Sequence, residues 1–230
     1  MSCDPLLTDD LAELLGLFPN DALGGVVGIL RKYKTWWPGE VPRAYAAHHL
    51  PDDADFKPHA RAIADEILWW GSHDLKRQFG TKVNYRQVVA ETARSIGVDK
   101  KERGPDEPAW RVEGAILRKV LKDWENLSPE KRAAVIEELG GSVEPLRGAL
   151  FAMPGAGVTG AQLLGLIAAR GLPFAVGAAV LAPVVTAVAA LWTAYDLAGP
   201  GYRVLRPVVT TIALTRRRLR DERAATAFRD

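Results

Sequence analysis

Side chains that commonly bind metals cluster in one short stretch of the sequence. His48, His49 and His59 flank three aspartates at positions 52, 53 and 55. Imidazole and carboxylate groups bind divalent metals, so an enzyme with a helical metal site at the three histidines is one alternative. However, the spacing matches no established metal pattern, H-E-x-x-H is missing, and the single cysteine, Cys3, excludes a cysteine-based zinc site. We therefore favour a polar surface loop and predict no metal.

A glycine-rich stretch is the second motif with potential chemistry. Gly155, Gly157 and Gly160 match G-x-G-x-x-G, the pattern of a dinucleotide-binding turn. The acidic residue expected about 20 positions later is missing, because the next acid is Asp196. A loop between helices explains the glycines better, and we predict no cofactor. The sequence also lacks a P-loop, a nucleophile elbow and a kinase-type motif set, so it predicts no enzyme.

The elements that would hold these residues are predicted to be helices. Apolar residues recur with a period near 3.6, whereas sustained period-2 alternation is absent, so we expect an all-α fold. Thr8, followed by two aspartates, is expected to begin the first helix, and Asn20 or Asp21 caps a second that runs to about Lys34. A short helix is expected over residues 43–50.

Three further amphipathic helices are predicted in the middle of the chain. Pro58 suits the first turn of a helix whose apolar stripe ends at residues 69–71. The next helix begins near Tyr85, and a longer one spans residues 110–127. A new helix is expected after Ser128, because a proline and an acid follow this residue.

The composition changes sharply after residue 147. Residues 148–169 and 171–195 are two uncharged runs of 22 and 25 positions, separated only by Arg170. We predict a helical bundle with an apolar Gly/Ala-rich C-terminal helical hairpin. Its four segments are N-terminal helices at 1–57, an amphipathic helical domain at 58–147, the hairpin at 148–198 and a basic helix at 199–230.

Each uncharged run is long enough to cross a bilayer, which takes roughly 20 apolar residues. Their many glycines and prolines disfavour spontaneous insertion, so a central hairpin wrapped by amphipathic helices is the favoured interpretation. The alternative is a hairpin that leaves the core and enters a membrane. Its candidate membrane-contacting residues are Leu164, Phe174, Val180, Val184 and Trp192.

Charge is unevenly distributed along the chain. Residues 141–230 carry ten arginines against five acidic residues, whereas residues 1–140 carry 20 basic and 23 acidic residues. The basic residues gather at 216–223 rather than along one face, so we predict no nucleic-acid partner. This cluster fits either a solvated helix end or a contact with anionic lipid.

Tryptophan pairs supply the candidate interaction residues. Trp69 and Trp70 are adjacent, so their side chains point about 100° apart on a helix, and one can join the core while the other covers a neighbour or partner. Together with Tyr202 and Arg203, they are the residues we predict to contact a protein partner.

Three stretches of the sequence resemble one bacterial protein family. They are residues 63–72 followed by 85–89, the helix from Glu113 to Trp124 with its restart at Ser128, and the closing segment from Gly199 through Pro207 to Arg217. This pattern resembles the YaaW-like family, which is grouped remotely with the ubiquinol–cytochrome c reductase assembly chaperones. The resemblance covers most of the chain beyond about residue 60.

The chain departs from the family pattern at two places. Gly71-Ser72 stands where paired glycines are usual, and Arg206 stands where an uncharged residue is expected. A charge at Arg206 argues against deep burial of that segment. The resemblance implies a helical protein with an apolar C-terminal part and no assigned catalytic residues.

These observations predict a non-enzymatic, helical protein-interaction or chaperone-like protein with a hairpin able to contact a membrane. An alternative is a membrane-disrupting effector of bacterial antiphage defence or competition, in which the hairpin is stored until triggered. Residues 1–10 include three aspartates and no basic residue, unlike a secretory signal. We expect a cytoplasmic protein. The alternative location is the inner membrane, with the protein either peripheral to it or inserted in it. The sequence leaves the partner and the oligomeric state open.

Overall fold

The computed structural model describes residues 4–34, 50–51, 54–75, 83–126 and 200–227. This part of the chain is built from helices and contains no strand, which confirms the predicted helical character for these residues. The α-helices are α1 (Leu11–Gly16), α2 (Asn20–Lys34), α3 (Ala60–Leu75), α4 (Tyr85–Ser95), α5 (Ala109–Glu125) and α10 (Pro200–Ala227). Short 3₁₀ helices are η1 (Pro5–Leu7), η4 (Lys57–His59) and η5 (Lys100–Glu102).

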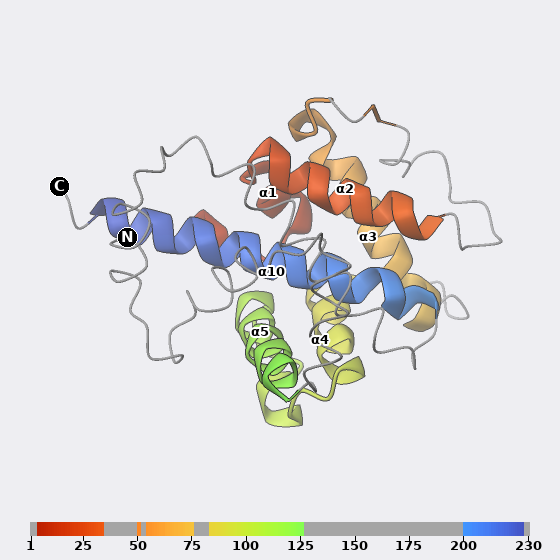
Figure 1. Ribbon diagram of the computed structural model, residues 1–230, viewed down its shortest axis with the longest axis vertical. Coiled ribbons are helices and arrows are strands. Elements are labelled where there is room, and N and C mark those ends of the chain that lie inside the picture. Colours follow the sequence, from red (N-terminus) through yellow and green to blue (C-terminus); the bar gives the residue numbers. More distant parts are fainter. Residues whose placement is uncertain (1–3, 35–49, 52–53, 76–82, 127–199, 228–230) are drawn as a thin grey trace.

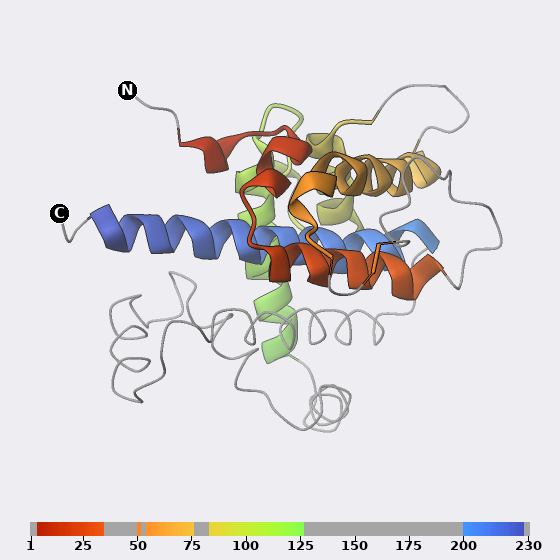
Figure 2. The same ribbon diagram turned by 90° about the horizontal axis from the view of Figure 1, so that it is seen from above.

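Helix α10 is the central element of the described fold. In Figure 1, α1 and α2 lie on one side of it, α4 and α5 lie on the other, and α3 runs behind it; Figure 2 shows α10 between α2 and α3. Seen from above, α2 runs alongside α10, whereas α5 crosses it steeply (Figure 2). The helix closest to the C-terminus is therefore enclosed by helices from the first 125 residues.

The core forms around the first half of α10. Every residue from Val204 to Arg216 is buried, and the apolar side chains among them belong to the same hydrophobic cluster as those of the other five α-helices. Removing this apolar surface from water is the main force that holds the helices against α10. The α10 members of the cluster are Val204, Leu205, Val208, Val209, Ile212, Ala213 and Leu214.

The charge of Arg206 puts deep burial of its segment in question, but the structure buries both the segment and the arginine. Arg206 is only 8% exposed. Its Nε donates to Ser95 Oγ at 3.1 Å, and its Nη2 donates to the Ser95 carbonyl oxygen at 2.8 Å. The charge is tolerated because it caps the C-terminal end of α4, where carbonyl groups lack helical partners.

Helix starts follow the polar residues in the sequence, with one shift. Asp10, rather than Thr8, caps α1, because its Oδ1 accepts from the amides of Ala12 and Glu13 at 2.8 and 3.1 Å. Asn84 forms a capping box with Gln87 at the start of α4. These caps satisfy amides that have no partner within their own helix.

Helix α3 continues beyond its predicted end at residues 69–71. It runs through Gly71 to Leu75. A Cβ atom at Gly71 would lie 2.5 Å from Val88 Cγ2, so the glycine allows α3 and α4 to approach each other closely. The residue therefore serves helix packing rather than helix termination.

The predicted hairpin at 148–198 lies outside the described residues, as does the expected helix after Ser128. Among the described helices, none combines the length and apolar character needed to cross a bilayer.

Candidate functional site

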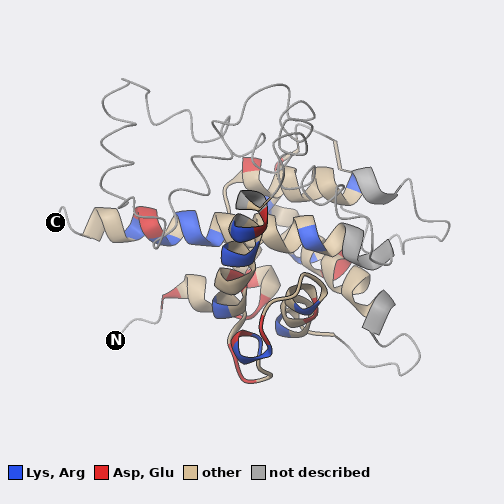
Figure 3. Cartoon of the chain, turned by 60° about the horizontal axis from the view of Figure 1, so that its bottom comes forward, with Lys and Arg blue, Asp and Glu red and all other residues tan. Residues whose placement is uncertain are grey.

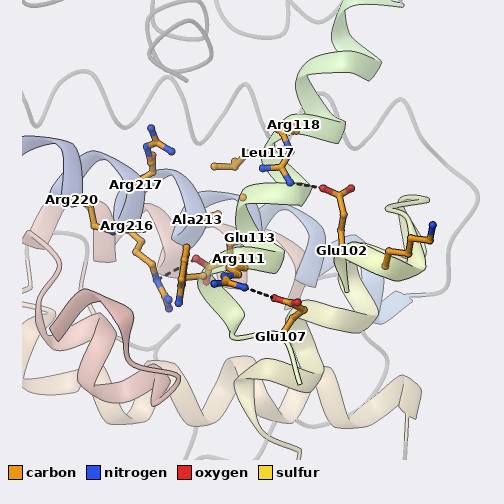
Figure 4. Close-up of a pocket in the computed structure, with 13 residues that line it drawn as sticks. Glu102, Glu107, Arg111, Glu113, Leu117, Arg118, Ala213, Arg216, Arg217 and Arg220 are labelled. Atoms are coloured by element: carbon orange, nitrogen blue, oxygen red, sulfur yellow. Dashed lines mark hydrogen bonds and ion pairs between the residues drawn. The ribbon is translucent and has the colours of Figure 1, made fainter. Parts of the chain in front are cut away.

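A cavity of about 430 Å³ lies between α5 and α10, next to η5 (Figure 4). We call it the α5–α10 pocket. Its inner wall consists of buried residues, among them Glu113, Ala213 and Arg216. Exposed and half-buried residues, including Lys101, Trp110 and Arg217, form its rim. The pocket thus reaches from the molecular surface to charged groups in the core.

The inner wall follows from the helical repeat. Glu113 lies on the buried stripe of α5, four residues after Ala109 and three before Ile116. Arg216 lies on the buried stripe of α10, four residues after Ile212. Residues three and four apart share a helix face, so both charged side chains are carried into the interface where α5 crosses α10.

A buried triad joins three helices at this wall. The Tyr85 hydroxyl of α4 donates to Glu113 Oε1 at 2.7 Å, and Arg216 Nε lies 3.2 Å from Glu113 Oε2. The side chains of Arg216 and Glu113 are 2% and 3% exposed. Because the ion pair is removed from water, its attraction is strong, but the desolvation of both charges opposes it.

Asp9 fixes the position of the two helices that carry Tyr85 and Glu113. Its Oδ1 accepts from the Ala109 amide at 2.9 Å, and its Oδ2 accepts from Arg86 Nη2 at 2.7 Å. One carboxylate before α1 therefore links the starts of α4 and α5, and this holds the triad together.

Desolvation dominates the protonation of the triad. Burial raises the pKa of Glu113 to about 7, and this effect outweighs the opposing influence of the Arg216 charge. Burial, followed by the negative charge of Glu113, raises the pKa of Tyr85 well above its usual value. Near neutral pH the Glu113 carboxyl therefore exchanges between charged and neutral forms while Tyr85 stays neutral.

Arg216 has donors that the triad leaves unused. Within the described part of the chain, neither of its two Nη atoms has a hydrogen-bond partner, although both are buried. Its Nε contacts Glu113 as an ion pair without the alignment of a hydrogen bond. A guanidinium group offers five donors in a rigid fork, so Arg216 retains the capacity to bind an acceptor.

The lining of the pocket carries an excess of positive charge. It includes six lysine or arginine side chains and three glutamates. Each glutamate has a basic partner. Arg118 Nη2 lies 2.5 Å from Glu102 Oε1, and Arg111 Nη1 lies 3.5 Å from Glu107 Oε2. Glu113 pairs with Arg216. Lys101, Arg217 and Arg220 make up the excess within the described lining, and the two arginines pair with Asp221 and Asp4, which lie outside it. Basic side chains recur along the C-terminal part of α10 (Figure 3).

Two arginines hold Trp110 at the rim. The guanidinium carbons of Arg111 and Arg220 lie 5.2 and 5.1 Å from the centre of its ring. Attraction between these cations and the electron-rich ring positions both side chains beside the pocket. Arg220 Nε also lies 3.7 Å from Asp4 Oδ2, and Arg217 Nε lies 2.9 Å from Asp221 Oδ2. These weak surface ion pairs orient the arginines at the rim.

Of the predicted interaction residues, Trp69 and Trp70 do not line this pocket. Trp70 is 1% exposed and belongs to the core, where it cannot contact a partner in this conformation, while Trp69 is half-buried against the core. Their rings make a T-shaped contact with centres 5.1 Å apart. Tyr202 and Arg203 fall in the first turn of α10, but their side chains lie outside the described part.

The remaining predicted sites are outside the described residues, with one exception. His59 lies in η4, whereas His48 and His49 are not among the described residues. In the described ranges, no group of three or more histidine, cysteine or acidic side chains is arranged to hold a metal ion. Gly155–Gly160 and the membrane-contacting candidates Leu164, Phe174, Val180, Val184 and Trp192 also fall outside those ranges.

Sequence reasoning missed the triad, although the signal was present. Glu113 and Arg216 are charged residues at positions that the apolar stripes of their helices assign to the core. Such positions predict buried ion pairs, because a buried charge needs a partner. The expectation that the cluster at 216–223 is either solvated or lipid-facing is wrong for Arg216, which is buried against α5.

Comparisons with known proteins give no relative for this chain, since no family model, no curated protein and no solved structure matches it.

Proposed function

We propose that this chain is a non-enzymatic, helical binding protein that holds an acidic segment of a partner protein in the α5–α10 pocket. The observation that carries the proposal is the charge of the pocket, whose described lining has six basic side chains, the buried Arg216 among them, and three acidic ones. Complementary charge at an interface steers the partner and selects against wrong ones. The proposal keeps the protein-interaction or chaperone-like role predicted from the sequence.

The chemistry of the rim favours a peptide over a small apolar ligand. Trp110 offers a large, partly buried aromatic surface beside the guanidinium groups of Arg111 and Arg220. Tryptophan and arginine are the side chains most often found at the energetic centre of protein interfaces. Acidic side chains on a peptide would pair with the rim, while its aliphatic groups would pack on the indole.

The test uses a fluorescently labelled hexaglutamate peptide and the full chain, with binding followed by fluorescence anisotropy. The double variant Lys101→Gln/Arg217→Gln removes two rim charges and should weaken binding about tenfold. The matched control Lys57→Gln/Arg61→Gln removes the same charge from exposed positions around the start of α3, on the other side of α10. It should change affinity less than twofold.

Two results would overturn the proposal. One is an equal loss of affinity in both double variants, which would mean that the peptide responds only to net charge. The other is binding to vesicles that contain anionic lipid without binding to the peptide, which would assign the basic rim to a membrane surface.

The alternative of a membrane-disrupting effector stays a prediction, because the hairpin it requires lies outside the described residues. Its test is expression in a bacterial host. The effector should harm the host, and Val180→Arg should abolish the harm by making insertion of the hairpin costly.

A further inference from the structure

Arg216 is the group in the described molecule whose bonding is least complete. Its side chain is 2% exposed, and within the described residues its two Nη atoms have no hydrogen-bond partner. Leaving a buried donor unsatisfied costs about 1–3 kcal/mol, and more when the donor is charged. Native structures therefore rarely bury such groups without a protein, solvent or ligand partner.

Arg206 shows that α10 can satisfy a buried arginine when the arginine is purely structural. Its guanidinium group donates to both the hydroxyl and the carbonyl of Ser95. Glu113 does not do the same for Arg216: one of its oxygens accepts from Tyr85, the other lies beside Nε, and neither Nη atom is hydrogen-bonded to it. The Nη side of Arg216 is thus left without an acceptor, and because both Nη atoms are closed to solvent, an acceptor from outside the triad reaches them only when neighbouring side chains move.

We infer that the inner wall of the α5–α10 pocket binds an oxyanion, a carboxylate or phosphate group, through the two Nη atoms of Arg216. The inference rests on the proposed function, since the oxyanion is the acidic group by which the partner segment enters most deeply. An oxyanion pairs with two guanidinium donors at once, which gives both strength and orientation. Lys101 at the rim, together with Arg217 and Arg220, which also pair with Asp221 and Asp4, guides it inward.

An oxyanion at this position would lie next to Glu113, and this makes binding depend on pH. The groups that act on Glu113 are Tyr85 from α4, Arg216 from α10 and Asp9 before α1. A further negative charge beside Glu113 favours its neutral form, so binding of the oxyanion is accompanied by proton uptake. Because burial already brings the pKa of Glu113 to about 7, this linkage falls between pH 6 and pH 8.

The experiment measures the affinity of the full chain for sulfate by titration calorimetry at pH 6 and pH 8. Sulfate is the probe because its charge is constant over this range. The unaltered protein should bind sulfate about tenfold more tightly at pH 6 than at pH 8. Glu113→Gln should bind equally at both pH values, with the affinity that the unaltered protein has at pH 6.

Arg216→Lys tests the anchoring group while keeping its positive charge. It should weaken sulfate binding at least tenfold at both pH values, because the ammonium group cannot reproduce the two Nη donors. Equal binding by this variant would reduce the site to an adventitious ion and overturn the inference. A weaker affinity in Glu113→Gln would overturn it as well.

A direct spectroscopic measurement does not depend on whether Arg216→Lys folds. Addition of sulfate to the unaltered protein should shift the guanidinium NMR signals of one buried arginine, while those of Arg206 stay in place. Unchanged signals from every buried arginine would contradict the inference.

The two proposals fail separately. Sulfate binding with the expected pH dependence, but no affinity for hexaglutamate, would support the oxyanion site and overturn the proposal that the pocket binds a partner segment. The opposite result is peptide binding that sulfate does not compete with and that Arg216→Lys does not weaken. It would support binding of a partner segment and overturn the oxyanion site.

Discussion

The two buried arginines of α10 illustrate opposite uses of the same side chain. Arg206 and Arg216 are ten residues apart, or about 15 Å along the helix, and both are less than a tenth exposed. Arg206 donates to two oxygen atoms of Ser95 and fastens α10 to the end of α4. Arg216 contacts Glu113 through Nε, and its Nη atoms have no hydrogen-bond partner among the described residues.

This difference separates a structural charge from a functional one. A buried charge with complete hydrogen bonding stabilises the position of its helix, whereas one with incomplete bonding keeps binding capacity at some cost in stability. The surroundings of the two arginines differ in the same way. Arg206 faces a helix end, while Arg216 lies in the wall of a cavity next to a carboxyl group that titrates near neutral pH.

The largest expected effect is the pH dependence of the free energy of unfolding, which arises at Glu113 beside Arg216. The pKa of Glu113 is about 7 in the folded protein and near 4.5 in the unfolded chain, so the folded state binds the proton more tightly. The resulting stabilisation is complete below about pH 4.5 and is lost as pH rises through 7, a change on the order of 3 kcal/mol. Urea unfolding at pH 5.5 and pH 8 should therefore show lower stability at pH 8.

Glu113→Gln is the reference for this measurement, because other groups also titrate over the same range. The variant should lose most of the difference in unfolding free energy between the two pH values. If both proteins show the same difference, the effect comes from other residues, and the contrast between the two ends of α10 loses its electrostatic basis.

The next effect concerns Arg206 itself. Arg206→Met removes two hydrogen bonds from a charged donor and should lower the free energy of unfolding by about 2 kcal/mol, with little dependence on pH. Arg217→Met, the same substitution at an exposed position of α10, should change it by less than about 0.5 kcal/mol. Similar losses in the two variants would show that Arg206 is not the clamp described above.

The smallest effect is expected at the exposed end of α10. Asp4 lies 3.7 Å from Arg220 and 3.2 Å from Arg223, and all three side chains are at least a third exposed. Asp4→Asn keeps an oxygen for the Leu6 amide and removes only the charge, so stability should fall by less than about 0.5 kcal/mol. A loss above 1 kcal/mol in thermal unfolding would mean that the exposed arginines also act as structural clamps.

The helices were predictable because their apolar residues repeat with the helical period. The stripe of Ile63, Ala64 and Ile67 is buried as its spacing indicates, and so are Tyr85, Val88 and Val89 of the next helix. The end of α3 was not predictable, since Gly71 normally weakens a helix and only the close approach of Val88 explains its presence.

The pocket was beyond sequence reasoning for a different reason. Tyr85, Glu113 and Arg216 are far apart in the chain, and helical periodicity gives the face of each residue without giving the helix that it meets. The arginine cluster was visible, but its first member enters the core while the others stay at the surface. That division depends on where α5 crosses α10, which is a property of the tertiary packing.

The central position of α10 also sets the order of events during synthesis. Helices from residues 5–125 bury their apolar faces against residues 204–216, which leave the ribosome much later. At about 5–20 residues per second, the delay between residue 125 and residue 216 is on the order of ten seconds. During that interval the earlier helices have no α10 to pack against, so the apolar surfaces that α10 later covers stay exposed on the nascent chain.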